Sequence, residues 1–295
     1  MPGASSMRSL RRGGIGTDSA VVSVGIIYKA LIEVGDHLTK PRTAGGNRWL
    51  STLGVTAEIM LTVGVGVLLY VFWYAIVNPA VVGVSQTETA AQQSRLYSEH
   101  LAQADATPSA TPLATATAAP IDVPVAVPVL AEPARSATPI AVIYIPRFGV
   151  DWKRVVRQST EAQVLDSATA GVGHYTGTAM PGGIGNFAVA AHDTGYGNTF
   201  LGVSTLKVAD RIYLQTDSGW YTYEFRNFQY VQPNAINVLN AVPTVSTTAT
   251  TDRIITLTTC NPPYHAAERM IAYGTFVGFS TAAPAELATT LAKGN

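Results

Sequence analysis

The sequence is poor in cysteine and in charge. A single cysteine, Cys260, stands among 295 residues, which excludes a disulfide within the chain and a cysteine-rich zinc module. Charged residues make up 13% of the chain, against roughly 25% in ordinary soluble domains, and the 19 basic and 19 acidic side chains cancel. Non-specific nucleic-acid binding depends on a net positive field, so we predict no nucleic-acid partner.

The longest stretch without charge runs over residues 59–77, IMLTVGVGVLLYVFWYAIV. As a helix it measures about 28 Å, which is enough to cross the hydrocarbon core of a bilayer. Tyr70, Trp73 and Tyr74 gather near its end, where an interfacial aromatic belt lies. The alternative, a buried helix of a soluble domain, is disfavoured because the run is apolar on all sides. We predict a transmembrane anchor over residues 53–82 that contacts the lipid bilayer through residues 59–77.

Basic residues are distributed unevenly about this span. Only Arg95 and Arg135 lie in residues 83–138, whereas residues 1–52 contain Arg8, Arg11, Arg12, Lys29, Lys40, Arg42 and Arg48. Because cytoplasmic flanks carry the excess of Lys and Arg, residues 1–52 are predicted to be a cytoplasmic segment, with an amphipathic helix over residues 20–34. The chain is then a single-pass protein of the cell membrane whose later residues are extracellular.

Residues 83–138 are rich in Ala, Thr and Pro and nearly lack aromatic residues. Repeated proline interrupts helices and central strands, and a segment with so little aromatic bulk cannot form a core. We therefore expect a disordered extracellular linker, with an extended reach on the order of 100 Å.

From residue 139 the pattern changes to short segments of aromatic and β-branched residues, separated by Gly, Asn and Asp. This pattern predicts a mainly β domain, an antiparallel barrel or sandwich, over residues 139–281, followed by a C-terminal tail over residues 282–295. The expected elements are strands over residues 141–146, 186–192, 211–217, 220–231, 253–260 and 269–279 and a short helix over residues 160–168.

Three reactive side chains are predicted at strand ends: Cys260 and His192 each end a strand, and Arg269 opens one. A neighbouring imidazole or guanidinium favours the nucleophilic thiolate form of a cysteine, and an imidazolium can protonate a leaving amine. Arginine does not deprotonate, so its better role is to donate hydrogen bonds to an oxyanion. Taken singly, each residue also has a structural interpretation, as a core cysteine, a strand-end histidine and a surface cation.

Two other kinds of site fit the order of these residues less well. A papain-like peptidase has its cysteine before its histidine and at the start of a helix, whereas His192 precedes Cys260, which ends a strand. A metal site of His192, Cys260 and His265 lacks CxxC or HxxxH spacing. We therefore expect neither a metal nor a cofactor.

The segment TLTTC at residues 256–260 resembles the TLxTC signature of sortases, the cysteine transpeptidases of bacterial cell surfaces. Residues 171–200 are similar to the region that carries the sortase histidine, and residues 261–274 are similar to the arginine-bearing strand. The resemblance extends over residues 140–279 and is greatest to class E, with class D next. It implies a sortase-like eight-stranded β-barrel with short helices, in which the catalytic residues are His192, Cys260 and Arg269.

The resemblance also implies a reaction and its partners. Cys260 would cleave the Thr–Gly bond of an LAxTG-like or LPxTG-like sorting signal on a secreted protein, and the acyl group would pass from a thioester to a peptidoglycan precursor or stem-peptide amine. The alternatives are a sortase-fold cysteine peptidase that only hydrolyses and an inactive sortase-fold binding module. The residues expected to line the substrate groove, because they lie beside the motifs, are Tyr175, Tyr196, Thr259 and Asn261.

One position departs from the family pattern. Related sequences often have a basic residue directly after the catalytic histidine, whereas here Asp193 follows His192. Adjacent residues of a strand point to opposite faces, so no direct contact between the two side chains is expected without a bend in the loop. His174 and His265 are expected to be structural or exposed.

Overall fold

The computed structural model describes residues 48–106, 126–245 and 250–292. Three sequence predictions lie at least partly outside these residues. The amphipathic helix over residues 20–34, nearly all of the cytoplasmic segment over residues 1–52, and residues 107–125 of the linker lie outside the described residues.

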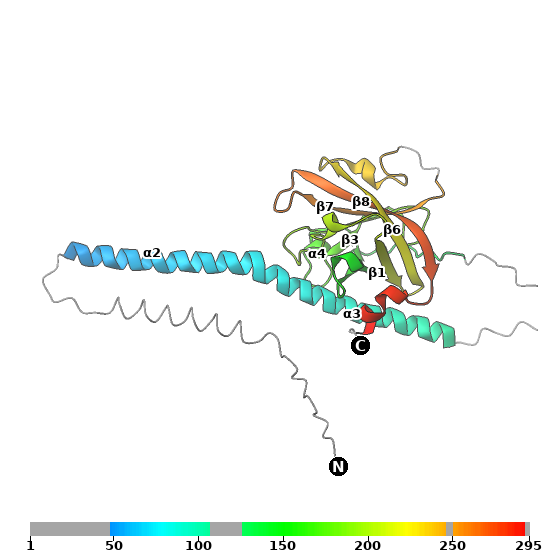
Figure 1. Cartoon of the computed structure of the whole chain (residues 1–295), viewed down its shortest axis with the longest axis horizontal. Coiled ribbons are helices and arrows are strands. Elements are labelled where there is room, and N and C mark those ends of the chain that lie inside the picture. Colours follow the sequence, from blue (N-terminus) through cyan, green and yellow to red (C-terminus); the bar gives the residue numbers. More distant parts are fainter. Residues whose placement is uncertain (1–47, 107–125, 246–249, 293–295) are drawn as a thin grey trace, which may run out of the picture. The chain divides into compact units, whose positions relative to one another are not determined.

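An apolar helix, α2 (Arg48–Phe72), continues through the π-helical turn η1 (Trp73–Val77) into α3 (Asn78–Ala106), as Figure 1 shows. The large hydrophobic side chains between Leu53 and Ile76 are exposed, Leu68 to 70%. Within the described residues, this is one helix long and apolar enough to cross a membrane. The span predicted over residues 59–77 therefore lies on a continuous helix.

Residues 83–106 do not form the disordered linker that the composition suggested, because they belong to α3. The prolines behind that prediction begin at Pro108, and from Pro79 to that position the chain has no proline and many good helix formers. The buried side chains recur every three or four residues and form one stripe along the helix: Gln86, Ala90, Ser94 and Tyr97.

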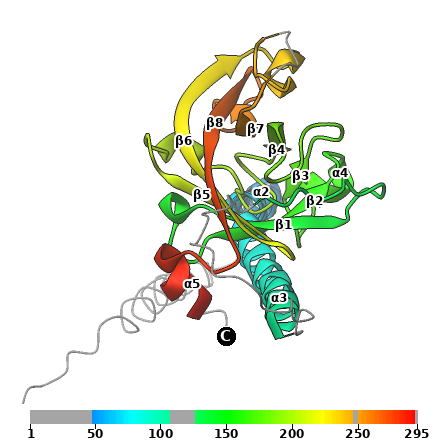
Figure 2. The same ribbon diagram turned by 90° about the vertical axis from the view of Figure 1, so that its right-hand side faces the viewer.

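Eight strands close into a barrel in the order β1-β2-β3-β4-β7-β8-β6-β5, and Figure 2 shows them around the barrel. The eight-stranded β-barrel implied by the resemblance is thus confirmed. Two neighbouring pairs, β2/β3 and β4/β7, are parallel, and the others are antiparallel. The strands are β1 (Pro139–Tyr144), β2 (Lys153–Gln158), β3 (Val172–His174), β4 (Gly185–Ala190), β5 (Arg211–Thr216), β6 (Gly219–Val231), β7 (Arg253–Asn261) and β8 (Glu268–Ser280).

Short helices lie between and after the strands. One of them, α4 (Ala162–Leu165), falls within the helix predicted over residues 160–168, and α5 (Ala288–Ala292) lies in the C-terminal tail. The remaining helices are the 3₁₀ turns η2 (Pro146–Phe148), η3 (Val203–Thr205), η4 (Ile236–Leu239) and η5 (Ala285–Leu287).

Two strands, β2 and β3, were not predicted from the sequence. β2 begins with Lys153 and Arg154, which are each only 5% exposed although their side chains are cationic. β3 is only three residues long. In addition, β4 ends at Ala190, so His192 lies two residues beyond the strand that it was expected to end.

The barrel interior is filled by aliphatic and aromatic side chains, such as Ile143, Phe187, Leu214, Tyr223 and Leu257. A second apolar cluster lies between α3 and the barrel and contains Ala90, Tyr97, Val142, Tyr144, Val155, Tyr213, Trp220 and Leu287. Polar contacts join the same surfaces, since the Tyr144 hydroxyl donates to Ser94 Oγ over 2.7 Å and Gln215 Nε2 donates to the Ser94 carbonyl over 3.0 Å. Helix α3 is therefore packed on the barrel.

Candidate active site

Cys260 and Arg269 lie opposite each other on neighbouring antiparallel strands. The register of β7 and β8 pairs these two residues. Side chains of directly opposed residues project from the same face of a sheet, with Cβ atoms roughly 4.5–5.5 Å apart. The thiol, which is partly exposed, and the guanidinium therefore share one face.

His192 is brought to the same end of the barrel by the parallel pairing of β4 with β7. The ladder pairs Ala190 with Thr258. Beyond it, the Ala191 N–H donates to the Thr258 carbonyl over 3.2 Å, and Thr259 Oγ1 donates to the Ala191 carbonyl over 2.9 Å. The chain that leaves β4 thus remains attached to β7 as far as the residue before Cys260.

The three predicted catalytic residues line one open cleft of about 250 Å³. Tyr175 and Thr259 from the predicted groove residues line it too. The remaining lining residues are Thr160, Leu165, Ala190, Ala191 and Thr258. The structure therefore brings together a thiol, an imidazole and a guanidinium that lie far apart in the sequence.

The guanidinium of Arg269 is held by the main chain of its own turn. Its Nη1 donates to the carbonyls of Ala266 and Glu268 over 3.2 and 3.1 Å. These bonds occupy one nitrogen of a group that has five N–H donors. The group can thus be fixed in place and still donate to a substrate carbonyl.

The other predicted groove residues have distinct contacts. The Tyr175 hydroxyl lies 2.9 Å from Thr258 Oγ1, which fixes its ring beside the cleft. Thr259 is buried and serves the contact with Ala191 described above. Asn261 donates from Nδ2 to Glu268 Oε2 over 3.2 Å and joins the ends of β7 and β8. Their role in substrate binding remains a prediction.

The residue that the sequence analysis missed is Asp166, which directly follows α4. Its Oδ1 lies 2.8 Å from His192 Nε2. The ring of Tyr196 stacks on that of His192, with the two ring centroids 5.0 Å apart. No motif in the sequence pointed to Asp166, because it lies 26 positions before His192 in a short loop.

The side chain of Asp193, the residue after His192, forms its hydrogen bonds with Thr194. It is 6% exposed, and its Oδ1 accepts hydrogen bonds from the N–H of Thr194 over 2.7 Å and from the Thr194 hydroxyl over 3.3 Å. Its Oδ2 has no hydrogen-bond partner among the described residues. The carboxylate that contacts His192 is that of Asp166.

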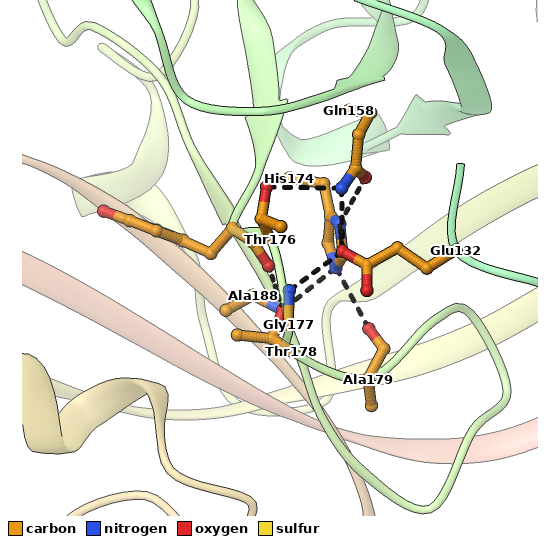
Figure 3. A network of polar contacts seen from close by, with 9 residues as sticks. Glu132, Gln158, His174, Thr176, Gly177, Thr178, Ala179 and Ala188 are labelled. Atoms are coloured by element: carbon orange, nitrogen blue, oxygen red, sulfur yellow. Dashed lines mark hydrogen bonds and ion pairs between the residues drawn. The ribbon is translucent and has the colours of Figure 1, made fainter. Parts of the chain in front are cut away.

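A network of polar contacts around the buried His174 lies at the end of β3 (Figure 3). His174 is fully buried, with Nδ1 2.9 Å from Gln158 Oε1 and Nε2 2.9 Å from Thr178 Oγ1. Glu132 Oε1 accepts from Gln158 Nε2 and from the Gly177 N–H, over 2.7 and 2.8 Å. Burial lowers the pKa of His174, and the hydrogen bond from Gly177 lowers the pKa of Glu132. His174 is thus structural, one of the two possibilities that the sequence left open.

Comparisons with known proteins identify the family of this domain. Residues 143–277 match the sequence profile of the family described as the Sortase domain. Sortase SrtE1 of Streptomyces coelicolor is 33% identical over 143 residues, which are 46% of this chain and 40% of that protein. The chain belongs to the sortase family. Sortase SrtE2 of the same organism is 30% identical over 42% of this sortase and 50% of its own length, so the chain spans half or less of these curated relatives.

Solved structures also resemble this sortase. The SrtA sortase from Actinomyces oris is 29% identical, covers 55% of this chain and 94% of its own, and has a TM-score of 0.51. Sortase E from Streptomyces avermitilis is 35% identical over 50% of this chain and 96% of its own, with a TM-score of 0.44. Sortases are cysteine transpeptidases that act on proteins with sorting signals and on amine acceptors. The curated relatives confirm the class E resemblance.

Proposed function

We propose that this sortase is a membrane-anchored transpeptidase with Cys260 as nucleophile, His192 as acid and base, and Arg269 as donor to the oxyanion. The observation that carries the proposal is that these three side chains line one open cleft at the ends of β7, β8 and the chain beyond β4. Nucleophile, proton carrier and oxyanion donor are the parts that acyl transfer requires.

In the first step, the Cys260 thiolate attacks the Thr carbonyl carbon of an LAxTG-like or LPxTG-like signal. A C–S bond forms, and the oxyanion that develops accepts hydrogen bonds from the Arg269 guanidinium. The C–N bond to Gly then breaks, and the His192 imidazolium gives its proton to the departing amine. The product is an acyl-enzyme thioester with a neutral imidazole.

In the second step, an amine of the cell wall attacks the thioester carbon. Neutral His192 takes the proton of the attacking amine, the C–S bond breaks, and its electron pair returns to Cys260 as thiolate. A new amide joins the secreted protein to a peptidoglycan precursor or stem peptide. With the predicted orientation, substrate and acceptor meet this cleft outside the membrane.

The test uses the full-length chain in detergent with two fluorogenic peptides, one containing LAxTG and one LPxTG, and a diamino acid acceptor. Mass spectrometry should detect an amide product whose yield increases with acceptor concentration. Cys260→Ala should lose both cleavage and product, because no thioester can form. Equal activity of wild type and Cys260→Ala would refute the proposal.

The same assay separates the alternatives. Cleavage with water as the only acceptor, over the whole range of amine concentrations, would indicate a cysteine peptidase. Peptide binding without cleavage would indicate an inactive binding module. Peptides that differ only at the second signal position then show the preferred signal.

A further inference from the structure

We propose that Gln86 of helix α3 positions the proposed catalytic histidine, because it holds together the two loops whose Asp166 and Tyr196 orient the ring of His192. The proposal goes beyond the acyl transfer described above and depends on His192 having its proposed role. It identifies Asp166, Tyr196 and Gln86 as positioning residues.

The first step of the argument is that the His192 ring is held on two sides. Asp166 Oδ1 lies 2.8 Å from Nε2, and the ring of Tyr196 is stacked on the imidazole at 5.0 Å and an interplanar angle of 30°. An ionised carboxylate only accepts hydrogen bonds, so this contact places a proton on Nε2. Nδ1 is then the nitrogen left for proton exchange with the reacting groups.

The other ionisable or charged groups about this ring have different contacts. Cys260, Arg269 and Tyr175 line the same cleft, and the Tyr175 hydroxyl is paired with Thr258. Asp193 directs Oδ1 to Thr194. Of these side chains, Asp166 is the one whose carboxylate contacts the His192 ring. A carboxylate in this position also stabilises the imidazolium that the first step needs.

The second step concerns what holds Asp166 and Tyr196 themselves. Both side chains come from loops, and Gln86 bonds to the main chain of each loop. Its Nε2 donates to the carbonyl of Ser167, the residue after Asp166, over 2.8 Å, and to the carbonyl of Tyr196 over 3.0 Å. Its Oε1 accepts from the Thr199 hydroxyl over 3.1 Å. Gln86 is fully buried, so these bonds form away from solvent.

The third step is that each of the two loops has a glycine where it contacts the Gln86 side chain. Gly171 and Gly197 have φ of +83° and +89°, and a Cβ at either position would overlap the Gln86 amide group. On the helix, Gly83 faces the Gly197 carbonyl, which lies 3.3 Å from where a Cβ of Gly83 would stand. Close approach of the two loops to Gln86 therefore requires glycine at Gly171 and Gly197.

A further contact fixes the helix to the barrel next to Gln86. Arg154 of β2 is 5% exposed, and its Nη1 donates to Thr87 Oγ1 over 2.8 Å. Burial lowers the pKa of this guanidinium to about 10, a pKa at which it still carries its charge at neutral pH. Removing Gln86 should therefore release the two loops while the helix remains docked.

The first experiment reads the His192 ring directly and does not depend on turnover. The full-length chain with ¹⁵N-labelled histidine is studied in detergent, and the His192 signals are assigned by their loss in His192→Gln. At a pH high enough for the ring to be neutral, two-bond ¹H–¹⁵N correlations should show the Nε2-protonated tautomer in the wild type. Asp166→Asn and Asp166→Ala should each show a mixture of both tautomers, since neither side chain is a carboxylate.

The second experiment measures kcat and KM of Gln86→Ala at a temperature well below unfolding. Because the two loops position the ring of His192, their release should lower kcat on the order of 10-fold or more. KM should change by less than about twofold. The matched control is Ser94→Ala on the same helix, which loses the hydrogen bond from Tyr144 far along the interface. This variant should keep the wild-type kcat even where its unfolding temperature is lower.

A double variant tests whether a side chain at position 197 and Gln86 compete for the same space. Gly197→Ala should lower kcat because its Cβ meets Gln86, and adding Gln86→Ala should not lower kcat further, because the overlap is gone. Gly195→Ala in the same loop is the control for backbone strain, since it also has positive φ but nothing within 4 Å of a Cβ.

Two results would overturn the proposal. One is an unchanged His192 tautomer in both Asp166 variants. The other is an equal loss of kcat in Gln86→Ala and Ser94→Ala, which would reduce the effect of α3 to general stability. If wild type forms no amide product, the function proposed above fails, and the tautomer measurement still decides whether Asp166 orients His192.

Discussion

At the scale of single residues, the cleft depends on side chains that take no part in the chemistry. Thr259 is one of them, since its buried hydroxyl bonds to the Ala191 carbonyl, directly before His192. Cys260 follows Thr259 in the chain. One hydrogen bond therefore couples the backbone positions of the proposed nucleophile and the proposed acid and base.

Thr259→Val keeps the shape of this side chain and removes its hydroxyl. Loss of a buried hydrogen bond costs about 1 kcal/mol, and up to roughly 3 kcal/mol where a partner is left unsatisfied. We expect the free energy of unfolding to fall by this amount in urea titrations, and kcat to fall with it. Thr259→Ser retains the hydroxyl and should lose less on both counts; a serine variant as impaired as the valine variant would contradict the role of the hydrogen bond.

The network of His174 and Glu132 predicts a dependence of stability on pH. The pKa of His174 is lowered from 6.5 in the folded chain, so below pH 6.5 the unfolded chain binds the proton more readily. Its contribution to stability is thus present above pH 6.5 and is lost as the pH falls towards the lowered value. Glu132, with a pKa lowered from 4.5, loses its contribution at lower pH still, below 4.5.

Urea unfolding at pH 7, 6, 5 and 4 checks this order. The free energy of unfolding should decrease between pH 7 and 5 in the wild type. It should decrease less over that window in His174→Gln, which does not titrate. Glu132→Gln should keep the wild-type slope between pH 7 and 6. A His174→Gln variant with the full wild-type slope between pH 7 and 5 would disprove the assignment.

The proposed catalytic residues could be predicted from the sequence, and the residues that hold them could not. The strand pattern placed Cys260, His192 and Arg269 at strand ends, and the family resemblance carried by TLTTC supplied their catalytic roles. Asp166 and Gln86 belong to no local pattern. Their partners, His192 and the loop carbonyls of Ser167 and Tyr196, lie 26 to 110 positions away and meet them only in the folded chain.

At the scale of elements, hydrophobic pattern predicted six of the eight strands, and its failures have physical causes. β2 begins with two buried cations, one of which, Arg154, donates a hydrogen bond to Thr87 of α3. The helix itself was missed because its buried stripe consists of Gln, Ala, Ser and Tyr, which carry little apolar signal. Neither β2 nor α3 was predicted from hydrophobic pattern, because the surfaces that they bury against each other are partly polar.

Removal of α3 tests how much it stabilises the barrel. A chain of residues 107–295 exposes the second apolar cluster and leaves Gln215 without its bonds to the Ser94 carbonyl and Ser98 Oγ, both 3.0 Å long. Each lost buried hydrogen bond costs about 1 kcal/mol, and the exposure of the apolar cluster adds to this loss. Together they should lower the unfolding temperature on the order of 10 °C. A chain of residues 78–295 is the control and should unfold near the full-length temperature. Equal unfolding temperatures for both chains would show that α3 is dispensable.

At the scale of the whole molecule, the docked helix changes how the barrel is connected to the predicted anchor. The linker predicted over residues 83–138 would have allowed a reach on the order of 100 Å. Residues 83–106 cannot supply it, because they are helical and Gln86 and Ser94 are bonded to the barrel. The apolar run over residues 59–77 is thus followed directly in the chain by the helix that supports the cleft.

The single cysteine makes the predicted orientation measurable in the wild-type chain, with two variants as controls. Cys260 is partly exposed in the cleft, so a membrane-impermeant maleimide can reach it only from the side on which the barrel lies. If residues 1–52 are cytoplasmic and the barrel extracellular, intact cells that express the full chain should be labelled to the same extent as permeabilised cells. Cys260→Ala should remain unlabelled in both. A second variant, Cys260→Ala with Ser6→Cys, moves the one thiol to the N-terminal segment and should be labelled only after permeabilisation; the reverse pattern in the two proteins would place the catalytic domain inside the cell and exclude cell-wall amines as its acceptors.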